Sequence, residues 1–346
     1  MTEALLASSP LLNRAGAVPA EGADAGVAWH YGDPVREQRE LEAGRARVDL
    51  SHRGVVTVSG PDRLTWLNSL TTQALAALPA RTSAEALILS PHGHVEHAMH
   101  LVDDGTTVWI TVEPGTAPAL VEYLRRMQFM LRVQVDDVSA DWAVVAEAVR
   151  GEGAEGGPVT WSDPWPHVTE GGTAYGPDDA EHPGWAWREL LVPRESLKEL
   201  ATEGEWAGTW AAEALRVAAW RPRLGAETDH RTIPHEVDWL RTAVHLQKGC
   251  YRGQETVARV HNLGRPPRRL VLLHLDGSVD TLPEPGADVL LREAPEGSRA
   301  LGRVTSAARH HELGPIALAV VKRNTPVEAE FVVDGVPAAQ EPIVGA

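Results

Sequence analysis

Residues 248–255 read Lys-Gly-Cys-Tyr-Arg-Gly-Gln-Glu and contain the only cysteine of the chain. A lone cysteine is often a small apolar packing residue without chemistry. Here Lys248 and Arg252 lie two positions to either side of Cys250, so in an extended segment both cationic heads would share a face with the sulfur. Nearby cations favour the thiolate form of a cysteine. The segment therefore predicts a functional thiol, with packing as the alternative.

The residues around the thiol indicate a ligand site as well as a reactive sulfur. Gly249 and Gly253 permit tight turns or close approach of the backbone to a ligand, and Gln254 and Glu255 add an amide and a carboxylate. Residues 248–269 hold six basic side chains and one acidic side chain, in a chain of formal net charge −16. The segment could bind a polar heterocycle, hold a reactive sulfur, or do both, and its charge favours an anionic ligand.

Patterns on both sides of this segment predict the fold class. A length of 346 residues predicts two or three units, because domains usually hold roughly 100 to 200 residues. Strand-like and helix-like periods alternate before residue 265, including a helix expected over 206–220, which predicts an α+β class. Short apolar runs bounded by Gly, Pro or Asn follow, as in a small β-barrel, at 270–275, 288–291, 302–306, 316–321 and 329–333. We expect a disordered tail at 1–28, α+β domains at 29–140 and 141–265, and a β-barrel domain at 266–346.

Composition and missing motifs argue against several function classes. The net charge of −16 disfavours direct nucleic-acid binding, which needs clustered Lys and Arg. The sequence has no Gly-rich dinucleotide fingerprint, phosphate-binding loop, nucleophile elbow or Cys-x-x-Cys pair. Its apolar runs are far shorter than the roughly 20 residues of a membrane-spanning helix, so we expect no membrane partner. A single cysteine in a chain of this size favours the cytoplasm.

Four histidines crowd one predicted hairpin at positions 92, 94, 97 and 100. His94 and His100 could share a strand face, but His97 would then point to the other face, which spoils a compact metal site. One cysteine cannot hold an iron–sulfur cluster alone, because a cluster usually takes several protein ligands. We therefore expect no resident metal, while transient handling of a cluster with partner proteins stays open.

Ordered motifs along the chain resemble those of a known family. The thiol segment continues through Thr-Val-Ala-Arg at 256–259, and the whole run resembles the signature of the YgfZ family, relatives of the glycine-cleavage T-protein. Three earlier segments resemble the opening strand and helix of that family, at 49–54, 58–62 and 66–72. Three later ones resemble its lead-in to the thiol motif, at 214–217, 222–225 and 233–236.

The resemblance implies a fold and a function. The fold would be three domains in a ring, with tetrahydrofolate in a central channel and a β-barrel at the C-terminus. The function would be support of the assembly or repair of iron–sulfur proteins, including enzymes that thiolate tRNA, so the expected partners are folate and iron–sulfur proteins or cluster-assembly factors.

These implications assign a role to each residue of the predicted site. Cys250 would act as thiolate, Lys248 and Arg252 would lower its pKa, and Gln254 with Glu255 would fix the loop. Arg223 and Arg259 would take the anionic tail of folate, and a tryptophan would stack on the pterin ring. The full set of predicted folate-binding residues is Asn68, Thr71, Trp220, Arg223, Gly249, Tyr251, Gly253 and Arg259.

The main alternative is a folate-dependent one-carbon transferase, either an aminomethyltransferase or a demethylase of the T-protein type. The T-protein resembles this chain in the hairpin around Gly93, but where it places an acidic residue this chain has His97 or Ala98. His97 or Glu96 would then be the general base, and the thiol would be incidental. A third hypothesis is a folate-regulated scaffold without chemistry of its own.

Overall fold

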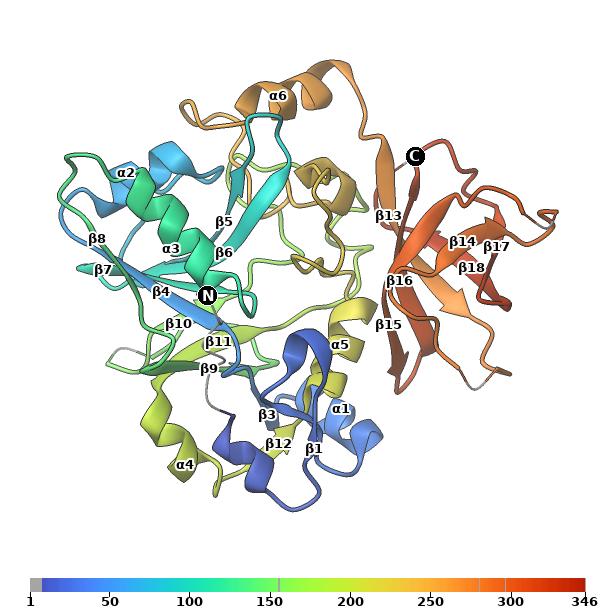
Figure 1. Ribbon diagram of the computed structural model, residues 1–346, viewed down its shortest axis with the longest axis horizontal. Helices are drawn as coiled ribbons and strands as arrows, with labels where there is room; N and C mark the ends of the chain where they lie inside the picture. Colours follow the sequence, from blue (N-terminus) through green and yellow to red (C-terminus); the bar gives the residue numbers. More distant parts are fainter. Residues whose placement is uncertain (1–7, 155, 280, 296, 346) are drawn as a thin grey trace. The chain divides into compact units, whose positions relative to one another are not determined.

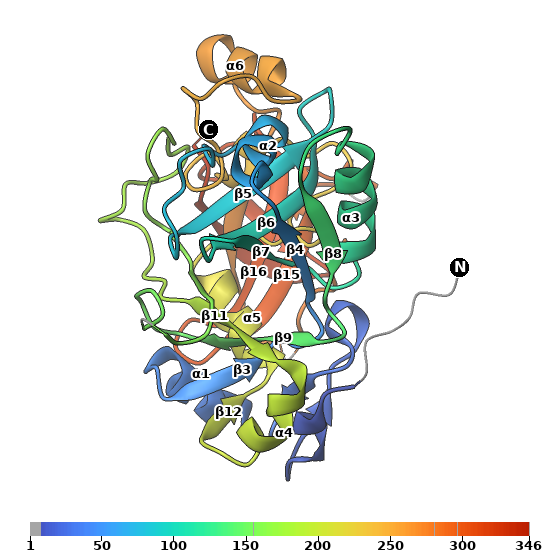
Figure 2. The same cartoon turned by 90° about the vertical axis from the view of Figure 1, so that its left-hand side faces the viewer.

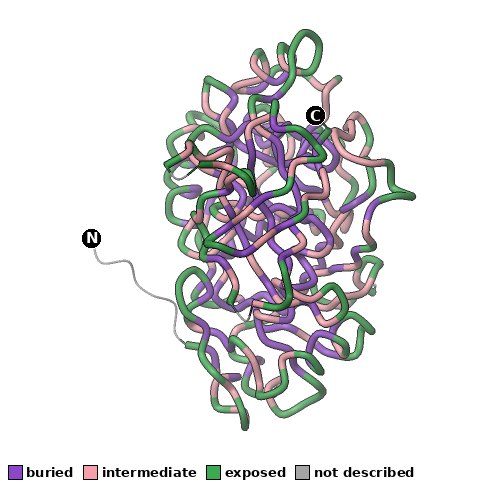
Figure 3. The backbone as a smooth tube through the Cα atoms, turned by 90° about the vertical axis from the view of Figure 1, so that its right-hand side faces the viewer, coloured by how far each residue is buried: buried purple, intermediate pink, exposed green. Residues whose placement is uncertain are grey.

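The computed structural model describes residues 8–154, 156–279, 281–295 and 297–345, and the chain divides into two compact units (Figure 1). Unit 1 comprises Met1–Leu87, His97–Pro164 and Ala186–Ala212. Unit 2 comprises Ile88–Glu96, Trp165–Trp185 and Glu213–Ala346. Buried stretches run through each unit (Figure 3). No helix in the described part of the chain is both long enough and apolar enough to cross a membrane.

The first sheet of unit 1 contains a largely buried strand, β4 (Gly54–Ser59), in which only Ser59 is partly exposed. Its order is β5-β6-β7-β4-β8, for Ser83–Leu89, Val95–Asp103, Thr107–Val112, Gly54–Ser59 and Gln134–Asp137. Helix α2 (Arg63–Leu70) contacts β7, and helix α3 (Ala117–Arg126) packs against β4 and β8 (Figure 2). Helix α3 buries Leu120, Val121 and Leu124, which recur at helical spacing on one face. Strand β8 stands last in the strand order and is an edge strand of this sheet.

The second sheet of unit 1 has the order β10-β11-β9-β3-β12, for Thr160–Ser162, Arg188–Pro193, Trp142–Glu147, Ala46–Asp49 and Glu205–Ala207. Helix α1 (Pro34–Glu42) packs beside β12 and β3. Two turns of helix follow β11, namely η3 (Arg194–Ser196) and α4 (Leu197–Leu200). Leu197 and Trp206 join Ala143 and Val145 in the core beneath these turns.

Unit 2 carries a closed barrel with the strand order β13-β16-β15-β14-β17-β18. The strands are Arg268–Leu275, Gly314–Lys322, Gly302–His310, Asp288–Leu291, Glu330–Val333 and Val336–Pro342 in that order. Alternate side chains such as Val271, Leu273, Ala317 and Ala319 fill its interior, as strand geometry requires. Helices η4 (Pro234–Val237) and α6 (Gln254–Leu263) precede the barrel, and α5 (Thr209–Ala218) runs across the boundary between the units. The predicted α+β class and C-terminal β-barrel are confirmed.

The predicted disordered tail at 1–28 is wrong for residues 8–28. These residues form η1 (Pro10–Asn13), β1 (Val18–Pro19) and η2 (Gly22–Asp24) and reach β2 (Ala28–His30). Residues 8–28 are ordered because Leu11 is completely buried in the same core as Trp206. Residues 1–7 lie outside the described residues. The predicted domain boundaries at 29–140, 141–265 and 266–346 stay a prediction.

The helix predicted over 206–220 begins later than expected. Residues Glu205–Ala207 form β12, which pairs in parallel with β3, and α5 covers only Thr209–Ala218. Burial of Trp206 against the sheet outweighs the helix propensity of the alanines that follow.

Candidate functional site

The thiol segment forms an irregular loop in unit 2, immediately before α6. Cys250 is exposed, whereas the next residue, Tyr251, is buried. The backbone N–H of Gln254 donates to the carbonyl of Tyr251 at 3.2 Å, which closes the turn into the helix. Tyr251 thus anchors the loop while the sulfur faces solvent. Packing alone does not account for an exposed cysteine at this place.

Two glycines allow the thiol loop to pack closely against the tip of the β5–β6 hairpin. Gly253 has φ +83°, a left-handed conformation that L side chains rarely adopt. A Cβ at Gly253 would lie 2.6 Å from the carbonyl oxygen of Ser90 and 3.1 Å from Cα of Gly93. A Cβ at Gly93 would in turn lie 2.7 Å from Cβ of Thr256. The close approach predicted for Gly253 is therefore made to the protein's own backbone.

An ion pair ties the same loop to the start of β6. The guanidinium of Arg252 donates to both carboxylate oxygens of Glu96, at 3.0 and 3.3 Å. The two side chains are 32% and 37% exposed, so water screens the pair and its contribution to stability is small. Glu96 partly neutralises the charge of Arg252. The predicted effect of Arg252 on the thiol pKa stays a prediction.

Lys248 lies half-buried two residues before the sulfur. Burial lowers the pKa of Lys248 to about 8. Its Nζ lies 5.3 Å from the ring centroid of Tyr251, within cation–π range, and burial also raises the pKa of Tyr251. An amine with this pKa is partly neutral at mildly basic pH, so Lys248 can accept a proton where an ordinary lysine cannot.

The predicted folate-binding residues are divided between the two units. In unit 1, Asn68 accepts from the backbone N–H of Leu75 at 2.9 Å, and the buried hydroxyl of Thr71 donates to the Leu67 carbonyl at 2.9 Å. These side chains serve the end of α2. In unit 2, the loop brings together Gly249, Tyr251 and Gly253, and Arg259 is exposed on α6.

Trp220 and Arg223 follow α5 and are largely buried. The Trp220 backbone has φ +58°, and its indole N–H has no hydrogen-bond partner within the described part of the chain. A guanidinium nitrogen of Arg223 lies 3.3 Å from a carboxylate oxygen of Glu213. Binding of a folate tail by Arg223 would compete with that pair, and the role stays a prediction.

An aromatic and polar cluster in unit 2 was not foreseen from the sequence. The ring of His182 packs edge-on against Trp165 and Trp220, with centroids 5.1 and 4.9 Å apart. Burial lowers the pKa of His182 to about 4, so the imidazole is neutral near pH 7. Trp165, His182 and Trp220 are distant from one another in the sequence, so no local sequence pattern predicted this cluster.

A second unforeseen cluster lies in unit 1 around Glu189, on β11. Its carboxylate is 1% exposed and accepts from Arg53 at 2.6 Å, from Thr111 at 2.8 Å and from the ring of His100 at 3.0 Å. Burial raises the pKa of Glu189, but the charges of His100 and Arg53 outweigh it and hold that pKa well below its usual range. His100 also stacks on Trp161, with ring centroids 3.7 Å apart, so it is a mostly buried structural residue.

Unit 1 also carries an aromatic pair near its surface. Trp29 and Trp210 stack with their ring centroids 5.4 Å apart, and Trp29 stays exposed. A flat exposed indole can receive a flat heterocycle. The two residues are 181 positions apart, so their pairing is a product of the fold rather than of a local motif.

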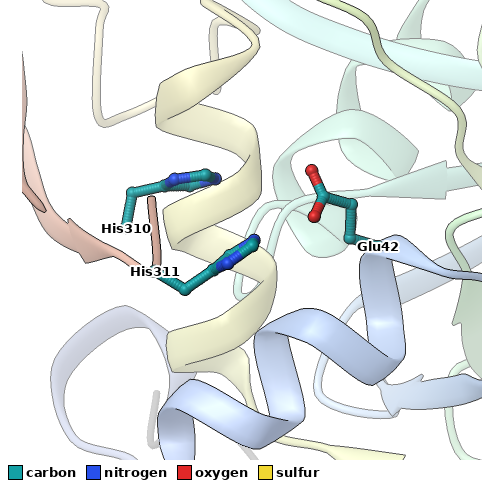
Figure 4. Close-up of side chains that lie close together, drawn as sticks. All are labelled: Glu42, His310 and His311. Atoms are coloured by element: carbon teal, nitrogen blue, oxygen red, sulfur yellow. The ribbon is translucent and has the colours of Figure 1, made fainter. Parts of the chain in front are cut away.

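His310 ends β15 and His311 follows it in the turn, with ring centroids 4.6 Å apart (Figure 4). Imidazoles are common metal ligands, but adjacent histidines also occur without an ion. The expectation of no resident metal stays a prediction.

Comparison with known proteins identifies relatives in sequence and a solved structure of the same fold. No protein-family model matches the chain. A candidate chloroplastic transferase of Arabidopsis thaliana is 24% identical over 289 residues, covering 77% of this chain and 62% of the relative. A mitochondrial homologue of the iron–sulfur cluster assembly factor IBA57, from Mycosarcoma maydis, is 25% identical over 246 residues, covering 64% of this chain and 55% of the relative.

The tRNA-modifying protein YgfZ of Shigella dysenteriae is 34% identical over 150 residues, covering 42% of this chain and 44% of the relative. The chain thus spans roughly half the length of the curated relatives that it matches. The glycine cleavage system aminomethyltransferase T of Bartonella henselae superposes with a TM-score of 0.73, covering 97% of this chain and 95% of that one. At 19% identity this likeness concerns the fold.

Proposed function

We propose that this chain is a member of a YgfZ/GcvT-like family and acts as a folate-binding accessory factor for iron–sulfur proteins, with Cys250 as its functional thiol. The names of two relatives support this, because one is an iron–sulfur cluster assembly factor and the other a tRNA-modifying protein. An effect on tRNA modification would then be indirect, through enzymes that depend on clusters.

The observation that carries the proposal is that Cys250 is exposed on a loop whose neighbouring residues on both sides are packed against the protein. Tyr251 and Lys248 are partly or fully buried beside it, and Gly253 and the Arg252–Glu96 pair hold the loop to the hairpin. A sulfur in this position can reach an atom on a partner molecule without unfolding of the loop. A thiolate is both a ligand for iron and a nucleophile, and Lys248 can take up the thiol proton.

The aromatic and cationic side chains of the chain fit a folate ligand. A hydrogen-bond acceptor on the pterin ring would satisfy the buried indole N–H of Trp220 in unit 2. Arg259, exposed on α6, would pair with a carboxylate of the glutamate tail. Tetrahydrofolate, when bound, supplies a carrier for one-carbon groups.

The test is replacement of Cys250 in cells that carry no other copy of the protein. Cys250→Ser should abolish the support of cluster-containing enzymes while leaving unfolding and tetrahydrofolate affinity nearly unchanged. Gln247→Ser, at an exposed position three residues earlier, is the matched control and should behave as the parent chain. Normal activity of cluster enzymes with Cys250→Ser would refute the proposal.

The one-carbon transferase remains the second hypothesis, because the fold is that of an aminomethyltransferase. The bidentate pair with Arg252 weakens the case for Glu96 as general base, since that pair would have to open before Glu96 could face a substrate. A panel of N-methyl and aminomethyl donors, assayed for folate-dependent release of formaldehyde or methylene-folate, separates the two hypotheses. Turnover that survives Cys250→Ser would favour the transferase. A cytoplasmic location stays a prediction.

A further inference from the structure

The turn between α3 and β8 presents three consecutive apolar side chains to solvent. Phe129 and Met130 are 83% and 98% exposed, and Leu131 is also exposed. Phe129 has φ +44°, an unusual conformation for a bulky residue. Single exposed apolar residues are ordinary, but contiguous ones usually mark a contact surface. We call these three residues the apolar tip.

A groove lies elsewhere on unit 1, where η1 and α4 flank the start of β9. It has a cavity volume of about 770 Å³, and its apolar lining includes Pro10, Leu12, Trp142 and Pro193. An adjoining cavity of about 660 Å³ shares Trp142 and Pro193 and extends past Leu200. We call the two cavities together the η1–α4 groove. Its volume is of the size that receives large apolar groups.

The tip and the groove carry opposite charges. Three arginines flank the tip, of which Arg125 and Arg132 form ion pairs with Asp136 and Asp62. Arg126 lies over the ring of Tyr123 and has no carboxylate partner among the residues that the structure describes, so it supplies the positive charge of the tip. Four acidic residues line the groove, namely Asp141, Glu195, Glu199 and Glu203. Two basic residues, Arg194 and Lys198, also line the groove, so four acidic and two basic side chains give its lining a formal charge of −2. The surfaces are therefore complementary in charge.

Strand β8 places the tip and the groove at its opposite ends. The tip ends three residues before Gln134, and the groove residue Asp141 follows Asp137 by four residues. A two-fold axis across the middle of β8 would bring the start of one β8 beside the end of the other. Each tip would then meet the groove of the other copy. The η1–α4 groove of one copy does not meet the tip of that copy, because β8 lies between them along the chain.

The contact would run through side chains rather than through pairing of the two edge strands. The guanidinium of Arg125 donates to the carbonyl oxygen of Val135 at 3.1 and 2.8 Å, in the middle of β8. A carbonyl that is already occupied is a poor partner for another strand. The two ends of β8 therefore hold the available contacts.

We propose that a second copy of this chain is the occupant, with the apolar tip of each copy inserted in the η1–α4 groove of the other. Reciprocal insertion doubles the buried surface relative to a single tip, which matters because a few side chains alone make a small interface. The result is a weak two-fold dimer that forms with rising concentration.

The experiment is sedimentation velocity of the full chain over a concentration series. The mass should rise from that of one chain toward that of two. Met130→Asp should weaken the association at least tenfold, because it removes an apolar side chain from the contact and places a negative charge beside the four carboxylates of the groove. Leu263→Asp is the matched control, since Leu263 is a similarly exposed apolar residue on α6 of unit 2, and it should leave the association unchanged.

A charge exchange tests the pairing of the two surfaces. Arg126→Glu and Glu195→Arg should each weaken the association several-fold, and the two together should restore it. A chain that stays monomeric at every concentration would overturn the proposal, as would a dimer unaffected by Met130→Asp. A monomeric chain whose tip instead binds vesicles of phosphatidylcholine and phosphatidylserine, with loss on Met130→Asp, would also overturn it and assign the tip to a membrane.

Discussion

The Arg252–Glu96 pair in unit 2 and the Glu189 cluster in unit 1 use similar side chains in different surroundings. Both side chains of the first pair are about one-third exposed, whereas the side chain of Glu189 is 1% exposed and its partners Arg53 and His100 are mostly buried. Water screens the exposed pair, so its removal costs little, but a buried charge that loses its partner costs several kcal/mol. The thiol loop is therefore stabilised mainly by the close backbone packing at Gly253. The region around β11 is stabilised in addition by the charge interactions of Glu189.

The largest effect is expected from removal of the buried carboxylate. Glu189→Ala should lower the free energy of unfolding by about 3 kcal/mol, because the mostly buried Arg53 and His100 lose their shared acceptor, although Arg53 keeps an ion pair with Glu113. Urea unfolding followed by tryptophan fluorescence measures the change. Glu96→Ala is the matched control at the exposed pair and should cost less than about 1 kcal/mol. Equal losses in the two variants would contradict the comparison.

A smaller effect is expected from the backbone of the thiol loop. Gly253→Ala should lower the free energy of unfolding by about 2 kcal/mol, because the new Cβ meets the Ser90 carbonyl in a left-handed conformation. Gly249→Ala is its control, since nothing lies within 4 Å of a Cβ at Gly249 and its φ is not left-handed. Thermal unfolding of the two variants side by side gives the difference. The idea of a locked loop fails if both substitutions cost the same.

The smallest effect concerns the pH dependence of stability through Lys248. Its pKa in the folded chain is about 8, below the ordinary value of 10.5, so the unfolded chain binds more protons between these two values. Stability should therefore rise with pH across that window, by about 1 kcal/mol after allowance for solvent screening. Lys248→Met should abolish this rise and stabilise the chain near pH 7. A rise of the same size in Lys248→Met would assign it to another group.

Local patterns allowed the barrel to be predicted, because each apolar run is bounded by turn residues. The exception is β18, whose residues include Pro337, Pro342 and a polar pair, so it lacks an apolar run. It becomes a strand only because β13 and β17 offer it hydrogen-bond partners on both sides. The order of residues 8–28 was missed for the same kind of reason, since the burial of Leu11 depends on residues far along the chain.

The thiol motif could be predicted because its chemistry lies within eight consecutive residues. Its surroundings could not, because Glu96 reaches Arg252 across 156 positions and Glu189 gathers partners from three other strands or loops. The burial that shifts the pKa of Lys248 is likewise a property of the folded loop. Sequence thus gives the reactive groups, and the fold gives their environment.

The reciprocal fit of Gly253 and Gly93 has a consequence for the evolution of the chain. A Cβ at either glycine would clash with the opposing turn. A substitution at one position is therefore tolerated only if that turn moves away. Descendants that change the length or path of the hairpin tip should therefore change the thiol turn with it. The two turns would be inherited as one unit, although more than 150 residues separate them in the sequence.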